Sequence, residues 1–81
     1  MAKEKQQMKQ VLEYIVKGIV KHPEEVIVVE FDEAEGKVFE IVVNEEDVGQ
    51  VIGKDGRTIK SLKVLLSALF GTEDFTLRVV R

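Results

Sequence analysis

The chain has 81 residues, a net charge of −3 and no cysteine. This length allows one small domain, and the lack of cysteine excludes a disulfide framework and a thiolate metal site. No apolar run approaches the roughly 18 residues that a membrane span needs, and no segment resembles a signal peptide. We therefore expect a single cytoplasmic domain over residues 1–81 that makes no membrane contact and needs no cofactor.

The charges are distributed unevenly along the chain. Residues 22–47 contain ten acidic residues and one base, whereas residues 54–63 contain four bases and one acid. The net charge argues mildly against a nucleic-acid ligand. The local excess of bases can nevertheless orient an anion on a protein that is acidic elsewhere.

The first predicted element is an amphipathic helix over residues 4–20, which Pro23 ends. Its apolar residues recur at steps of three and four. They are Met8, Val11, Leu12, Ile15, Val16, Ile19 and Val20. Such a helix can lie on a membrane surface, but the strands predicted next need a cover, so we interpret this stripe as core. His22 precedes the proline and is interpreted as a loop residue.

Residues 26–31 and 38–43 are predicted to form a β-hairpin. If residues whose numbers sum to 70 face each other, one face of the hairpin is apolar throughout. Its pairs are Ile27/Val43, Val29/Ile41 and Phe31/Phe39. The same register leaves residues 34–36 as a three-residue loop with Gly36 at its left-handed position.

This register also defines the opposite face of the hairpin. That face pairs Val28 with Val42 and opposes Glu30 to Glu40, which are like charges. Val28 and Val42, together with Val80 of the last strand, are the candidates for an apolar contact on the outer face of the sheet.

Asn44 and the three acidic residues after it predict the start of a second, short helix. Asn is a common N-cap, and the helix dipole favours acids in the first turn. A capped helix start explains these acids more simply than a metal site does. The helix ends at a bend marked by Gly53, and Gly49 lies one turn earlier.

Two glycines, Gly53 and Gly56, form the bend between the second and third helices. They lack a Cβ and therefore allow another backbone to approach closely. The third helix aims its free N–H groups and its positive dipole end at this point, and Lys54 and Arg57 add cations. The bend therefore predicts a seat for a phosphate. A nucleotide P-loop fits poorly, because Lys54 is followed by Asp55 where Ser or Thr is needed.

The third helix is predicted over residues 57–70, stopped by Gly71. Its inward residues are predicted to be Ile59, Leu62, Leu65, Leu66, Leu69 and Phe70. Lys60 can reach a strand that leaves the bend, whereas Lys63 lies too far along the helix and contributes only its field. Residues 75–81 are a last strand with Phe75, Leu77 and Val79 facing inward.

The nonapeptide Val-Ile-Gly-Lys-Asp-Gly-Arg-Thr-Ile at residues 51–59 resembles the signature of KH domains, whose GXXG loop clamps about four nucleotides of single-stranded nucleic acid. The order helix, strand, strand, helix, helix, strand resembles the type II KH arrangement, an α+β fold with three helices on one face of a three-stranded sheet. The chain looks most like the small bacterial single-KH proteins of the KhpA type.

This resemblance implies a cytoplasmic protein that binds single-stranded RNA as a post-transcriptional factor. It also implies association with a second copy or with a KH protein that carries a Jag domain. Carried over by position, the RNA-binding residues are the clamp Gly53, Lys54, Asp55 and Gly56, the apolar walls Ile52 and Ile59, the cations Arg57 and Lys60, and Gly49. Gly49 either leaves room for a base or is a packing glycine.

One departure from the family and one alternative function remain. The hairpin loop is often basic or polar in RNA binders, but here it holds Asp32, Glu33 and Glu35, which we expect to weaken binding and shorten the RNA footprint. The alternative is a KH fold used mainly for protein docking. An enzyme is a poor rival, because Ser61 and Ser67 are expected to lie far from His22.

Overall fold

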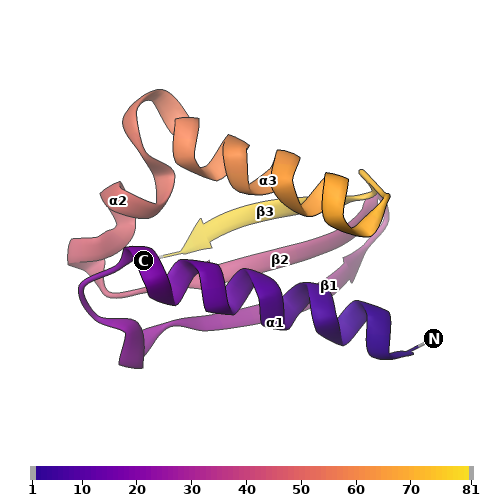
Figure 1. Ribbon diagram of the computed structural model, residues 1–81, viewed down its shortest axis with the longest axis horizontal. Helices are drawn as coiled ribbons and strands as arrows, with labels where there is room; N and C mark the ends of the chain where they lie inside the picture. The colour runs from indigo at the N-terminus through magenta and orange to yellow at the C-terminus, as the bar shows by residue number, and fades with distance from the viewer. Residues whose placement is uncertain (1, 81) are drawn as a thin grey trace.

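Two helices lie across one face of a three-stranded sheet, and a third, short helix stands at one end (Figure 1). The computed structural model describes residues 2–80, and the side chains of residues 8–80. The helices and strands are α1 (Ala2–Ile19), β1 (Ile27–Glu33), β2 (Gly36–Val42), α2 (Val48–Ile52), α3 (Arg57–Phe70) and β3 (Phe75–Val80). Single 3₁₀ turns occupy Pro23–Glu25, Glu45–Asp47 and Lys54–Gly56. The predicted order of elements is confirmed.

The sheet is mixed and has the order β1-β2-β3. Strands β1 and β2 form an antiparallel hairpin, and β2 and β3 are parallel. Parallel neighbours need a crossover connection, and here the crossover contains α2, the glycine bend and α3. The bend joins α2 to α3 and lies at one edge of the domain (Figure 1).

The predicted apolar stripe of α1 is confirmed as core. Met8, Leu12 and Val16 are buried, and the other four predicted residues of the stripe pack against the core. All three strands contribute to the core, namely Val28 of β1, Phe39 and Ile41 of β2, and Phe75 of β3, with Leu77 and Val79 packed alongside. Val26 and Val43, which adjoin the strands, are buried as well. In this core the ring of Phe75 meets the ring of Phe39 edge-on, with centroids 6.1 Å apart.

The predicted register of the hairpin is wrong by one residue. Val28 faces Ile41, and Ile27 faces Val42, so facing numbers sum to 69. A slip of one residue exchanges the two faces of a strand. Val28 is accordingly buried at 2% exposure, whereas Ile27 is 55% exposed on the outer face.

The turn explains why the register differs. Glu33 pairs with Gly36, so the turn has two residues and not the predicted three. Glu30 therefore does not oppose Glu40. Glu30 lies on the helix side beside Lys37, with 2.6 Å between Nζ and Oε2, and Glu40 accepts a hydrogen bond from Arg78. Of the three valines proposed for the outer face, Val28 is excluded, and Val42 and Val80 pair on that face.

Helix α3 has the predicted bounds, but its buried stripe is narrower than predicted. Leu62 and Leu66 are buried, and Ile59 and Phe70 pack against the core. Leu65 and Leu69 were predicted to face inward but are 45% and 59% exposed. Helix α3 lies over β3, which is an edge strand (Figure 1). The side of α3 that points beyond this edge has no strand beneath it. The predicted stop at Gly71 is confirmed, with φ of 67° and its N–H bonded to the Ser67 carbonyl.

Within residues 2–80, the helices are too short or too polar for any of them to cross a membrane.

Candidate nucleic-acid interface

The glycine bend has three residues with positive φ in four positions. Gly53 has φ of 79° and ψ of 171°, and Asp55 and Gly56 have φ of 56° and 75°. Among residues 2–80, Asp55 is the one non-glycine residue with positive φ. Aspartate tolerates this left-handed region better than most residues do. The acid inside a basic loop therefore has a conformational reason.

Gly53 cannot be replaced without moving the loop. A Cβ at this position would lie 2.2 Å from Oγ1 and 2.7 Å from the backbone nitrogen of Thr58. The bend is thus folded tightly over the first turn of α3, whose N–H groups have no partners within the helix. Thr58 was not among the predicted site residues. The β-branched residue after a GXXG segment is the signal that points to it.

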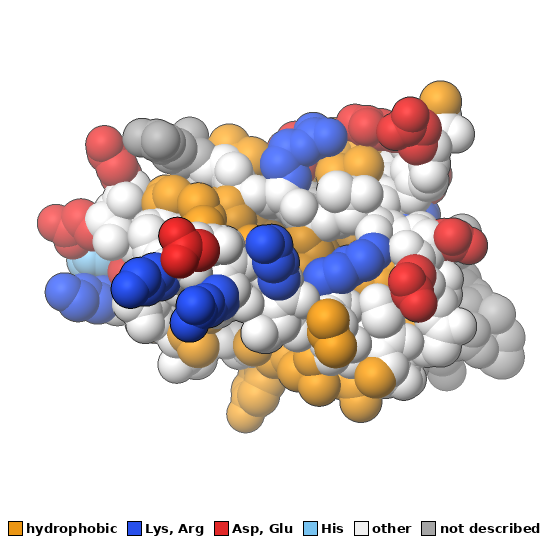
Figure 2. Space-filling model, turned by 90° about the horizontal axis from the view of Figure 1, so that it is seen from above, with side chains coloured by type: hydrophobic (Ala, Val, Ile, Leu, Met, Phe, Trp, Pro, Cys, Tyr) orange, Lys and Arg blue, Asp and Glu red, His pale blue; other side chains and the backbone are white. Residues whose placement is uncertain are grey.

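The predicted cations surround the bend and are free. Lys54, Arg57 and Lys60 are exposed, and none of them takes part in an ion pair with another described residue. A Cβ placed on Gly56 would lie 3.8 Å from Cε of Lys60 and 4.0 Å from Cγ2 of Ile59, so the bend adjoins both side chains. Figure 2 shows Lys and Arg side chains in a row that starts at this end of the molecule.

A groove runs from the bend between α3 and β3. It has a volume of about 540 Å³ and is mostly apolar, as the hydrophobic surface between the basic side chains in Figure 2 shows. Its lining residues are Ile59, Lys60, Lys63, Val64, Phe75, Thr76 and Leu77. Apolar surface beside a cationic, backbone-exposing bend is the combination that single-stranded nucleic acid needs, because bases and phosphates are held differently.

Of the predicted site residues, Ile59 and Lys60 line the groove, and Gly56 of the bend adjoins them. Ile52 is half-buried at the end of α2, where the Gly53 N–H bonds to the Gly49 carbonyl at 2.8 Å. Gly49 itself is exposed, and a Cβ there would meet no other atom within 4 Å. The β3 side of the groove was not predicted as part of the site. Strand β3 forms this side because it pairs in parallel with β2, and Phe75 and Leu77 thereby lie opposite α3.

Lys63 differs from the other three cations of α3 and the bend. Its ammonium donates to the backbone carbonyls of Glu73, at 2.9 Å, and Phe75, and lies 3.7 Å from the centroid of the Phe75 ring. That Lys63 contributes only its field to RNA binding stays a prediction. The contact of its side chain with the start of β3 was not predicted.

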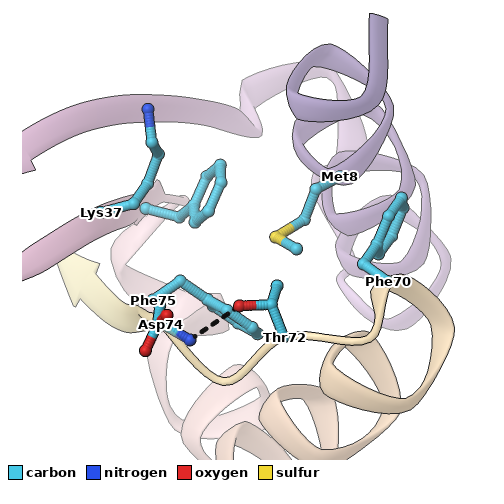
Figure 3. Close-up of a pocket in the computed structure, with 7 residues that line it drawn as sticks. Met8, Lys37, Phe70, Thr72, Asp74 and Phe75 are labelled. Atoms are coloured by element: carbon cyan, nitrogen blue, oxygen red, sulfur yellow. Dashed lines mark hydrogen bonds between the residues drawn. The ribbon is translucent and has the colours of Figure 1, made fainter. Parts of the chain in front are cut away.

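A second hollow, of about 240 Å³, lies near the opposite end of α3 (Figure 3). Met8, Phe70 and Phe75 are among the residues around it. Its cation, Lys37, is held by Asp32 and Glu30, whose hydrogen bonds raise the pKa of the lysine. This hollow offers mainly apolar surface and is separate from the glycine bend.

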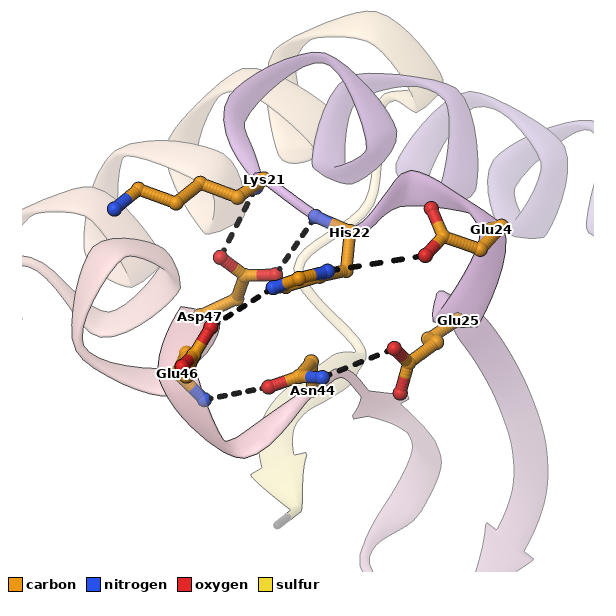
Figure 4. A network of polar contacts seen from close by, with 7 residues as sticks. All are labelled: Lys21, His22, Glu24, Glu25, Asn44, Glu46 and Asp47. Carbon is orange, nitrogen blue, oxygen red and sulfur yellow. Dashed lines mark hydrogen bonds and ion pairs between the residues drawn. The ribbon is translucent and has the colours of Figure 1, made fainter.

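A polar network fixes α2 to the end of α1 (Figure 4). The carboxylate of Asp47, 1% exposed, accepts the backbone N–H groups of Lys21 and His22, both at 3.0 Å. Asn44 caps the turn as predicted, since its Oδ1 accepts the Glu46 N–H at 2.8 Å. Of the acids that suggested a metal site, Asp47 and Glu46 make contacts in this network, which joins the turn before α2 to the loop after α1.

His22 is confirmed as a loop residue and belongs to the same network. Its Nε2 lies 2.9 Å from Oε1 of Glu46, and its Nδ1 lies 3.8 Å from Oε2 of Glu24. The hydrogen bond to Glu46 raises the pKa of His22. Desolvation opposes this effect, and the charges of Asp47, Glu46 and Glu24 add to it. The histidine therefore connects the loop after α1 to the turn before α2.

Comparison with known proteins agrees with this geometry. The KH domain of KhpA and KhpB matches residues 9–80. A protein of Thermotoga maritima named RNA-binding protein KhpA is 73% identical over 75 residues, which are 91% of this chain and 100% of the relative. Proteins of the same name from Leifsonia xyli and Chlamydia caviae are 52% and 44% identical over 72% and 73% of this chain, and 76% of each relative. The chain therefore belongs to the KhpA/KhpB family of KH domains.

Proposed function

We propose that this protein binds single-stranded RNA, with backbone phosphates at residues 53–56 and bases in the groove between α3 and β3. The observation that carries the proposal is a left-handed bend beside an apolar groove, with three exposed cations around it that form no ion pair with another described residue. The relatives named as RNA-binding proteins support the same ligand. A duplex hides its bases, so single strands should be preferred.

The proposal assigns no catalytic role and places the protein in the cytoplasm. Two of the residues that could act as nucleophile or base, Ser67 and His22, make other contacts. The Ser67 hydroxyl donates to the Lys63 carbonyl within its own helix at 2.8 Å, and His22 pairs with Glu46. A nucleophile and its base need to be within hydrogen-bond reach of each other.

Lys54→Asp tests the phosphate seat. Loss of one charge-assisted contact costs roughly 1.5–3 kcal/mol, and repulsion adds to this. With about three cations engaged, the log–log salt slope for a single strand should be about −2, and the variant should flatten it by roughly 0.7. Fluorescence polarisation with single-stranded and duplex RNA at several salt concentrations measures both quantities.

Asp55→Asn is the matched control for this experiment. Asparagine also tolerates positive φ, so the loop should keep its shape while losing a negative charge, and binding should stay equal or tighten slightly. Stability of Lys54→Asp should change by no more than about 0.5 kcal/mol. If the folded Lys54→Asp variant binds like the wild type, or duplex binds as well as single strands, the proposed seat is wrong.

A second part of the proposal is association, either with another copy of this chain or with a KH protein that carries a Jag domain. Large apolar side chains are exposed on two surfaces that the core does not use. On the helical side they are Tyr14, Val64, Leu65 and Leu69, and on the outer sheet face they are Ile27 and Phe31. Were the RNA groove to fail its test, a docking function on these surfaces would become the leading candidate.

A further inference from the structure

The side chain of Lys63 connects the two walls of the groove. It originates on α3, and its ammonium is bonded to the carbonyls of Glu73 and Phe75 at the start of β3. The face of the Phe75 ring lies 3.7 Å below the charge, and this ring is itself buried. Two carbonyls and a fixed aromatic ring hold the ammonium in one place, unlike the exposed ammonium groups of Lys54 and Lys60.

One donor of this ammonium is still available. A lysine has three N–H donors and no acceptor, and two of them point to backbone carbonyls. No carboxylate among the described residues forms an ion pair with Lys63. The groove therefore contains a positioned positive charge whose third N–H has no oxygen acceptor among the described residues.

Lys63 also marks the end of the groove. On one side Lys63 lines the groove together with Lys60 and Leu77. On its other side it lines a separate hollow together with Ser67 and Glu73. Beyond Lys63 the surface is acidic, because Glu73 is followed by Asp74, and the Asp74 carbonyl lies 3.5 Å from the Cβ position of Gly36 in the acidic hairpin turn. A strand that continued past Lys63 would meet carboxylates.

The distance from the bend to Lys63 is short. Gly56 and Lys63 are seven residues apart on α3, which is about 10 Å of helix. A GXXG clamp holds about four nucleotides. At the roughly 3.4 Å per nucleotide of a stacked strand, three steps from the bend cover a similar distance, so we expect the last base near the ammonium.

We propose that Lys63 closes the far end of the groove and selects, at the last base position, a base with a carbonyl oxygen at position 4 of a pyrimidine or position 6 of a purine. Uracil and guanine present such an acceptor, whereas cytosine and adenine present an amino group at the equivalent atom. An N–H donor of a fixed ammonium bonds to the first kind and is repelled by the second. This inference rests on the proposed binding of RNA in the groove.

The test uses short oligouridylates in which each position in turn is replaced by cytidine. Polarisation should find one position, near one end of the footprint, where the replacement weakens wild-type binding roughly tenfold or more. Lys63→Met keeps the aliphatic stem and removes the donors, so discrimination at this position should fall to within about twofold. Lys63→Arg should retain the preference. Should the Met variant fail to fold, Lys63→Leu replaces it, since leucine also carries no charge and no donor.

The salt slope separates this role from a phosphate contact. Lys63→Met should leave the slope unchanged, whereas loss of a phosphate contact would flatten it by roughly 0.7. The inference is overturned if no position of the wild type prefers uridine to cytidine, or if Lys63→Met weakens binding to all oligonucleotides equally. Failure of the proposed function gives a different result. RNA would then not bind at all, or its affinity would be the same for Lys54→Asp as for the wild type.

Discussion

Gly49 differs from the two glycines of the bend in its surroundings. It lies inside α2 with open space at its Cβ position, whereas a Cβ on Gly53 would collide with Thr58. Glycine inside a helix costs about 0.5–1 kcal/mol relative to alanine. No described atom packs closely enough against Gly49 to offset this cost. We therefore expect the glycine to leave room for a base of the bound RNA.

Gly49→Ala tests this expectation. The free energy of unfolding should rise by up to about 1 kcal/mol, because alanine favours the helix. Affinity for single-stranded RNA should fall severalfold, because the methyl group occupies the space of a base. Denaturant titration and polarisation measure the two effects. Gly53→Ala is the contrast and should lower both. Unchanged RNA binding by Gly49→Ala would remove Gly49 from the interface.

At the residue scale, the sequence pattern was sufficient for the bend but not for its surroundings. Two glycines and adjacent cations predicted the seat, since both features are local. The face of β1 could not be predicted, because Ile27 and Phe31 on one side and Val28 on the other are all apolar. The two-residue turn decided the register.

At the element scale, the junction between α1 and α2 depends on protonation. His22 faces Glu46 and Glu24, and the neighbouring Asp47 accepts the His22 backbone N–H. These acids raise the pKa of the imidazole in the folded state. The protonated imidazole therefore stabilises the folded state, and this effect is fully present below about pH 6.5, the ordinary pKa of histidine. The effect disappears as the pH rises through the raised folded-state pKa.

Comparison of the wild type with His22→Gln should reveal this dependence. Glutamine is neutral and keeps the backbone N–H that bonds to Asp47. The wild type should melt at a higher temperature than the variant at about pH 5.5, and the difference should shrink by about pH 8.5. Thermal unfolding followed by circular dichroism measures both. A difference in melting temperature that does not change with pH would mean that the imidazole charge has no part in the junction.

Element bounds were largely predictable, because the helix and strand periods are local signals. The exact range of α3 followed from the bend at its start and Gly71 at its end. Its exposed leucines did not, since Leu65 and Leu69 fit the helical period as well as Leu62 and Leu66 do. Which of them are buried depends on where the helix lies over the sheet.

At the scale of the whole molecule, the exposed apolar side chains are the basis of the proposed association. Sedimentation velocity from micromolar to millimolar protein should show the average mass rise above that of the monomer. Leu69→Glu places a charge on the helical surface and Ile27→Glu on the outer sheet face. The variant that restores the monomer identifies the surface. A wild type that stays monomeric throughout leaves only a different partner protein.

The groove is formed only while β3 is paired with β2, because one of its walls is β3. Residues 43–74 separate these strands, and a connection of that length must close before the pairing is gained. The β1–β2 hairpin needs only local contacts. Strand β3 is therefore expected to open more readily than the hairpin. RNA that contacts β3 can bind only while β3 is paired with β2. Bound RNA should accordingly slow amide hydrogen exchange in β3 while leaving the hairpin unchanged.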